Sequence, residues 1–221
     1  MEKKDLIEHS PVRYFEKATA ATLKAGEMGL VSAKKGLGKT SVLVQFALDD
    51  LLKDKTVVHV SFDQHSSNVI SWYTSVLAEI AKKKNLTNLS DISEDIVRNR
   101  IILNFNRETF TLPKVVKTLR ALKEGGLNID AIIVDGLDID NRPIENIKCF
   151  KDYIVEENIT AWFSLTNESP LLAETLPAEK LDLFATVTHI FPNGGDIYLG
   201  VLKNGEGKVS LDSKTLLMSK K

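Results

Sequence analysis

Residues 31–46 read VSAKKGLGKTSVLVQF, and this stretch decides the fold that the rest of the chain is expected to build. A short apolar run ends at Ala33, a loop with two glycines follows, and an apolar pattern of helical period begins near Gly38. Residues 33–40 match the pattern G-x-x-x-x-G-K-[ST] at every defined position except the first, where Ala33 replaces glycine. A strand, a glycine-rich loop and a helix in this order predict a loop that binds phosphate.

The residue types in this loop suit an anionic ligand. Gly36 and Gly38 let backbone N–H groups crowd around phosphate oxygens, and the helix after Gly38 points its positive end at them. Lys39 is expected to reach the β- and γ-phosphates as a catalytic residue, and the Thr40 hydroxyl to bind Mg²⁺. The methyl group of Ala33 is a small addition that the loop can accommodate. The other predicted nucleotide contacts are Lys34, Lys35, Leu37 and Ser41.

Residues 131–136, AIIVDG, supply the second half of such a site. An apolar strand ends here in an acid, two strand-helix units after the loop. Asp135 is expected to hold Mg²⁺ through a coordinated water. The pair of motifs is more specific than either motif alone.

Alternating strand and helix patterns predict the fold class. The apolar, β-branched runs typical of buried parallel strands are residues 29–33, 56–62, 101–105, 131–135 and 160–166. The amphipathic helical patterns are residues 38–53, 67–83, 112–123 and 144–157. This order predicts an α/β fold with a doubly wound, mainly parallel sheet and helices on both faces. The length suits a single domain over residues 1–221.

The end of the chain has a different pattern. Residues 186–191, 196–202 and 207–211 are short strand candidates separated by the turn sequences PNGG and NGEG. They predict C-terminal antiparallel hairpin strands that extend one edge of the sheet.

Composition excludes several classes of protein. The net charge is −1, so no global field attracts nucleic acid or a membrane surface. A single cysteine excludes an intrachain disulfide, and the four histidines lack metal-ligand spacing. No apolar run approaches the length of a membrane span, and we expect a cytoplasmic protein.

With these motifs in view, the chain resembles the RecA-type P-loop ATPases, in the branch that includes KaiC, RadA and the DnaB-type helicases. The resemblance covers most of the chain: a lead-in segment, the Walker A loop, a long helix and a second strand that ends at Asp63. It implies that the protein binds ATP and Mg²⁺.

The resemblance also implies roles for residues outside the loop. Asp63 stands where the family places the acid that polarises the attacking water, so it is the second catalytic candidate. The segment WFSLTNES (162–169) resembles the strand end that senses the γ-phosphate, which implies a relay through Thr166, Asn167 and Glu168. Lys203 stands in a hairpin triplet that reaches a neighbouring subunit's nucleotide in that family.

Two departures from the family pattern predict slow chemistry. The acid after the second strand is usually glutamate, and the shorter Asp63 displaces the carboxylate by about 1 Å, which can cost on the order of 100-fold in rate. Lys203 is followed by Asn204 and Gly205, so the expected arginine is missing, and such an arginine can supply about 10³–10⁵ in rate. We therefore expect a weak ATPase or a nucleotide-dependent regulatory switch.

Two alternatives remain open at this point. Lys34 occupies the position of the extra loop lysine in the ParA/MinD group, which would imply a dimeric ATPase in which this lysine contacts the partner's phosphates. The chain could also be a non-enzymatic interaction module with a vestigial nucleotide site. The segment 162–169 and the final hairpin favour the RecA-type interpretation.

The expected partners are a nucleotide and either a second copy of the chain or another protein. The loops after the fourth and fifth strands carry Arg142 and Lys180 among a majority of acids. Acidic loops repel a phosphate backbone, so we expect no strong nucleic-acid binding through this face. No membrane association is expected. The acids of these loops are Asp138, Asp140, Glu145, Glu168, Glu174 and Glu179.

Overall fold

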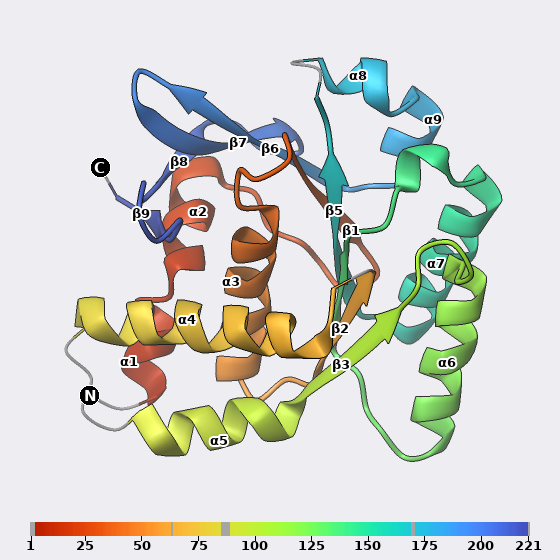
Figure 1. Cartoon of the computed structure of the whole chain (residues 1–221), viewed down its shortest axis with the longest axis horizontal. Helices are drawn as coiled ribbons and strands as arrows, with labels where there is room; N and C mark the ends of the chain where they lie inside the picture. Colours follow the sequence, from red (N-terminus) through yellow and green to blue (C-terminus); the bar gives the residue numbers. More distant parts are fainter. Residues whose placement is uncertain (1–2, 63, 85–88, 169–170, 221) are drawn as a thin grey trace.

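The computed structural model describes residues 3–62, 64–84, 89–168 and 171–220. Its centre is a nine-stranded sheet in the order β3-β2-β4-β5-β1-β6-β7-β8-β9, with helices on both faces (Figure 1). This confirms an α/β fold with a mixed, mostly parallel sheet.

Six neighbouring strands run parallel and form the core of the sheet. Their side chains are almost entirely buried, except on the edge strand β3, because helices cover both faces. The strands are β1 (Met28–Ala33), β2 (Val57–Phe62), β3 (Arg100–Phe105), β4 (Ala131–Asp135), β5 (Thr160–Thr166) and β6 (Thr186–Asn193). The first five lie within one residue of their predicted bounds.

The prediction for the C-terminal strands is wrong in one respect. β6 pairs in parallel with β1, Leu30 facing Val187, and so belongs to the parallel core as well as to the hairpin. Only β7 (Asp196–Lys203), β8 (Lys208–Leu211) and the unpredicted β9 (Met218–Ser219) extend the sheet in antiparallel fashion. The chain between β5 and β6 crosses back to the far side of β1, which local turn sequences do not reveal.

One face of the sheet packs against α3 (Lys39–Leu52), which is buried nearly all round. Further helices enclose α3, so its sequence is apolar on every side rather than on one stripe. They are α1 (Lys3–Glu8), α2 (Pro11–Thr19), α4 (Ser66–Lys84) and α5 (Leu89–Asn99). On α4, Trp72 is 38% exposed, whereas its neighbour Tyr73 is buried.

The other face packs mainly against α6 (Leu112–Glu124) and α7 (Ile144–Glu157), the right-hand pair in Figure 1. Pro113 stands in the first turn of α6, and Asn158 ends α7 in a left-handed conformation. Three short elements complete this side: the 3₁₀ turn Ile139–Asn141, α8 (Leu172–Thr175) and α9 (Ala178–Leu181).

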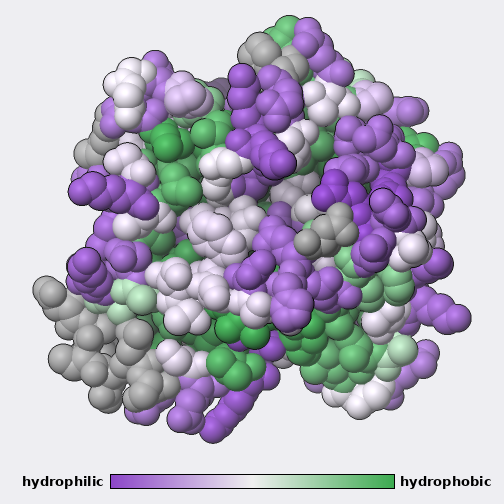
Figure 2. All heavy atoms as spheres, in the orientation of Figure 1, coloured by the Kyte–Doolittle hydropathy of each residue, from purple (hydrophilic) through white to green (hydrophobic). Residues whose placement is uncertain are grey.

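The outer edge of the sheet is β3, whose side chains are only partly covered. Figure 2 shows a hydrophobic patch over this part of the molecule, beside α6. The apolar side chains on β3 are Ile101, Ile102, Leu103 and Phe105, all half-buried. An apolar edge strand offers unpaired backbone groups to another strand.

Candidate functional site

The predicted phosphate loop lies between the carboxyl end of β1 and the start of α3. Gly36 and Gly38 have φ values of 83° and 92°, in the left-handed region that favours glycine. Gly38 is the N-cap residue of α3 and supplies no side-chain cap, so the first N–H groups of the helix point into the loop. This is the backbone geometry that binds anions.

Lys39 opens α3 and folds back over the loop. Its Nζ donates to the carbonyl oxygens of Ala33 and Lys34, each at 3.2 Å. Burial lowers the pKa of Lys39, and the negative charges of Asp135 and Glu168 oppose that shift. Lys39 forms no ion pair with any residue that the structure describes. The ammonium group is therefore partly desolvated, and its acceptors among the described residues are the two neutral carbonyls.

The two predicted magnesium ligands come together. The Thr40 hydroxyl donates to Asp135 Oδ2 at 2.7 Å, although the residues lie 95 positions apart in sequence. The turn after Asp135 is tight, because a Cβ at Gly136 would lie 2.7 Å from the Phe62 carbonyl oxygen. The Gly136 N–H donates to Ser164 Oγ at 2.9 Å and so ties the end of β4 to β5.

The predicted sensor residues lie beside the loop. The Asn167 N–H donates to the Ala33 carbonyl at 2.9 Å, which joins the end of β5 to the end of β1. The buried Asn167 side chain accepts a hydrogen bond from Thr175 on α8. Glu168 Oε1 accepts from the Lys35 N–H at 3.4 Å, so a carboxylate lies against the loop's backbone donors.

The remaining loop residues differ in their access to a ligand. Lys34, Lys35 and Gly36 are exposed, Leu37 is half-buried and Ser41 is fully buried. The predicted catalytic Asp63 lies outside the described residues.

Lys203 is remote from the loop within the chain. It ends β7 opposite Val187, near the start of the parallel strands, whereas the loop follows their carboxyl ends. Its Nζ donates to the Leu181 carbonyl at 3.2 Å and lies 3.6 Å from Asp182 Oδ1. Its predicted contact with a neighbouring subunit therefore stays a prediction.

The cations of the loops beyond β4 and β5 have structural roles. The buried Lys180 amine donates to the carbonyls of Ile139 and Asp140, and Arg142 donates to the Arg107 carbonyl. Arg107 in turn binds both carboxylate oxygens of Asp138 at 3.0 Å. These contacts hold the loop after β4 in place and engage Asp138 away from Thr40.

Sequence reasoning missed a segment that closes over the loop from the C-terminal side. Residues 212–219, here called the strap, lead into β9. A Cβ built on Gly38 would lie 2.5 Å from Leu216 Cδ1. Gln45 of α3 donates to the Leu216 carbonyl at 2.9 Å and accepts from the Met218 N–H at 2.8 Å. No sequence motif marks the strap; Gln45, a polar residue in the apolar middle of α3, was the available signal.

Comparison with known proteins leaves the family open. No protein-family model matches the chain, and no curated protein matches it. None of the helices in the described part of the chain is long and apolar enough to cross a membrane.

The residues present fit a nucleotide with magnesium. The hydroxyl of Thr40 and the carboxylate of Asp135 are the hard oxygen ligands that Mg²⁺ prefers. Apart from the chain neighbours of Gly36, no atom of the described residues lies within 4 Å of a Cβ built there, so the backbone can be approached closely. A desolvated lysine and helix N-terminal N–H groups adjoin this oxygen pair, an arrangement that stabilises phosphate charge.

Proposed function

We propose that this protein binds ATP with Mg²⁺ through a RecA-type nucleotide site and acts as a nucleotide-dependent switch or weak ATPase. The observation that carries the proposal is the contact between Thr40 and Asp135, which brings a hydroxyl and a carboxylate together beside the glycine-rich loop. The nine-strand order as a whole does not establish a RecA-type fold, so the proposal rests on this geometry and on the loop motif.

Each residue would act through its position. Gly36 and Gly38 would present backbone N–H groups to the phosphates, and Lys39 would exchange its two carbonyl acceptors for β- and γ-phosphate oxygens. Thr40 and Asp135 would hold Mg²⁺, which supplies charge stabilisation between the phosphates when it is bound.

Asn167 and Glu168 are suited to relay the state of the site. Asn167 is bonded both to the end of β1 and to α8, so a change at the phosphate position would reach α8 directly. Glu168 carries a negative charge beside the loop, and its carboxylate would have to move away when a γ-phosphate binds. Nucleotide binding would therefore be coupled to the segment after β5.

Titration calorimetry with ATP and Mg²⁺ tests the proposal. We expect binding by the parent protein and loss of at least about 100-fold in affinity for Lys39→Ala, because the desolvated ammonium is removed from the phosphates. Lys24→Ala, at an exposed lysine away from the loop, is the matched control. Absence of binding by the parent protein would refute the proposal.

Phosphate release separates a switch from a weak ATPase. We expect slow release by the parent protein, and faster release by Asp63→Glu if the shortened acid limits the chemistry. Binding without release, unchanged in Asp63→Glu, would assign the protein as a switch.

A dimeric ATPase of the ParA/MinD kind is the second candidate, because the Lys34 side chain is exposed at the loop. In that case Lys34→Ala would abolish ATP-dependent dimerisation while leaving nucleotide binding by the monomer intact. Mass measurement with and without ATP distinguishes the candidates.

A further inference from the structure

Two adjoining hollows form a trough along α2, on the side away from the parallel core of the sheet. The larger, of about 760 Å³, lies between α2 and the edge of β8, and the smaller, of about 300 Å³, lies between α2, α4 and the strap. They share Tyr14, Ser219 and Lys220 and are therefore continuous. Figure 2 shows hydrophobic side chains framed by hydrophilic ones over α2 and β8.

The trough is cationic in a protein whose net charge is −1. Lys17, Lys208 and Lys220 line the larger hollow, and none of them forms an ion pair with a residue that the structure describes. No acid is among the lining residues that belong to the described part of the chain. Two acids outside the lining are engaged by other residues: Asp212 pairs with Lys83 at 3.1 Å, and Asp196 accepts from the Tyr198 hydroxyl.

Two aromatic rings position the ammonium group of Lys208. Its Nζ lies 4.1 Å from the centre of the Tyr198 ring and 5.8 Å from that of Phe191, on rings that stack on each other. These contacts fix the position of the ammonium without neutralising its charge. The Tyr198 face is thereby covered, which leaves it unsuited to stack on a nucleic-acid base.

The walls of the trough favour an extended chain. β9 pairs with Ser210 and Leu211, and within the part of the chain that the structure describes no strand pairs with the outer edge of β8 at Lys208 and Val209. The exposed Ala18 and the half-buried rings of Tyr14 and Tyr198 supply apolar surface, and Ser210 and Ser219 supply hydroxyl groups. Alternating apolar and anionic side chains would match this lining.

The strap forms one wall of the trough and also contacts α3, the helix that begins at the predicted nucleotide site. Met218 belongs to the trough and is bonded to Gln45 of α3, while Leu216 packs against Gly38 at the N-cap of the same helix. Leu216 has a φ of 57°, a left-handed conformation that a leucine holds only when its surroundings require it. A displacement of the strap would thus be felt at the loop.

We propose that the trough binds an extended acidic segment of a partner protein, and that this docking is coupled through the strap to the phosphate loop. Three lysines that form no ion pair with any described residue provide the charge complementarity, and the apolar and aromatic walls provide contact area. The docking itself is independent of the proposed nucleotide function; the coupling rests on it.

Fluorescence anisotropy with a labelled peptide of alternating glutamate and leucine or serine tests docking without any nucleotide. We expect binding that weakens with salt, and a loss of about tenfold or more in the triple variant Lys17→Glu, Lys208→Glu, Lys220→Glu. The control variant carries Lys24→Glu, Lys117→Glu and Lys148→Glu, at lysines that are exposed and lie outside the trough. It should bind the peptide as the parent protein does. Circular dichroism establishes that both variants are folded.

Three results would overturn the docking proposal: no binding by the parent protein, equal binding by the two triple variants, or tighter binding of oligothymidylate than of the peptide. The last result would assign the trough to single-stranded nucleic acid.

Coupling is tested by repeating the titration with ATP and Mg²⁺. We expect ATP and Mg²⁺ to change the peptide affinity several-fold in the parent protein. We expect no such change in Gln45→Ala, which removes both hydrogen bonds between α3 and the strap. If ATP binds and the peptide binds but neither alters the other, the coupling is refuted while docking and nucleotide binding both stand. If ATP does not bind, the proposed function and the coupling that rests on it both fail, while docking stands.

Discussion

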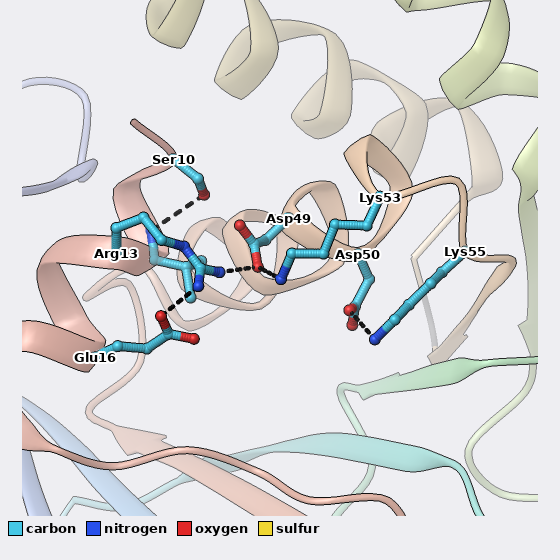
Figure 3. A network of polar contacts seen from close by, with 8 residues as sticks. Ser10, Arg13, Glu16, Asp49, Asp50, Lys53 and Lys55 are labelled. Carbon is cyan, nitrogen blue, oxygen red and sulfur yellow. Dashed lines mark hydrogen bonds and ion pairs between the residues drawn. The ribbon is translucent and has the colours of Figure 1, made fainter. Parts of the chain in front are cut away.

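The two ends of α3 hold charged groups in opposite ways. At its C-terminal end, Asp49 accepts from Arg13 of α2 and from Lys53 at 2.6 Å, while Arg13 also binds Glu16 (Figure 3). The neighbouring Asp50 pairs with Lys55 at 2.7 Å. At its N-terminal end, Lys39 has only two neutral carbonyls as acceptors.

The first arrangement stabilises the fold, whereas the second suits the binding of a ligand. Charges that already neutralise one another would gain little free energy by pairing with a ligand. The network around Asp49 therefore serves to join α2 to α3. A desolvated cation beside free N–H groups gains free energy when an anion arrives. Changes at the first end should therefore alter stability, and changes at the second should alter ligand binding.

The largest effect is expected from Asp49→Ala. Its carboxylate is 6% exposed, and its loss leaves Arg13 and Lys53 without their shared partner. We expect the free energy of unfolding to fall by about 3 kcal/mol in urea titrations, with ATP affinity unchanged. Asp50→Ala, which frees one half-exposed lysine, should cost about 1 kcal/mol. A loss of ATP binding in folded Asp49→Ala protein would break the comparison.

Acid should destabilise the fold because His59, a fully buried residue on β2, resists protonation. Burial lowers the pKa of His59 to about 4, with Arg100 adding to this shift and Asp135 opposing it. The unfolded chain, with a histidine pKa of 6.5, takes up the proton first as the pH falls. Stability is thus complete above pH 6.5 and is lost toward pH 4, by at most about 3 kcal/mol.

Urea titrations of the parent protein and of His59→Gln across this pH range measure the effect. The difference between them should shrink as the pH falls, because the variant lacks the titrating group. A constant difference from pH 7 to pH 4 would contradict the prediction.

Two glycines of the loop offer a matched pair. Gly38→Ala is expected to cost about 2 kcal/mol, because the new methyl meets Leu216 and the backbone is left-handed. Gly36→Ala meets no atom within 4 Å and should cost only about 1 kcal/mol of backbone strain. Thermal unfolding of both variants measures the difference. Equal losses would mean that the strap does not press on the loop.

The smallest effect is expected from Glu168→Gln. The amide oxygen can still accept from the Lys35 N–H, but the negative charge beside the phosphate position is gone. We expect ATP affinity to rise about three- to tenfold, which calorimetry measures, with stability unchanged. Glu179→Gln, an exposed acid on α9, is the control and should leave affinity unaltered.

Much of the fold was predictable because its strands are buried on both faces. Five apolar runs and four helical patterns predicted elements that lie within a residue or two of the observed bounds. α2 and α5 went unpredicted because they lie outside the regular strand-helix alternation, although Ser10 and Pro11 are a helix start signal for α2. The parallel pairing of β6 with β1 depends on a crossover that no local pattern encodes.

The candidate site was predictable where a spacing reflects chemistry. Gly36, Gly38, Lys39 and Thr40 lie together because one strand-loop-helix unit holds them. The joining of Thr40 to Asp135 was expected because parallel strands bring their carboxyl ends to one edge of the sheet. Sequence could not show that Glu168 lies against the loop or that Ser41 is fully buried.

By itself the sequence determined the α/β alternation and the phosphate-loop motif, because both depend on residue order over short distances. Only the tertiary structure decided which charges are neutralised and which remain available. That outcome depends on partners distant in the chain: Asp49 meets Arg13 of another helix, the strap reaches Gly38 from the far end, and three lysines share one trough without a carboxylate among its lining residues. Pairing across such separations follows from packing, which fixes the distances on which electrostatic energies depend.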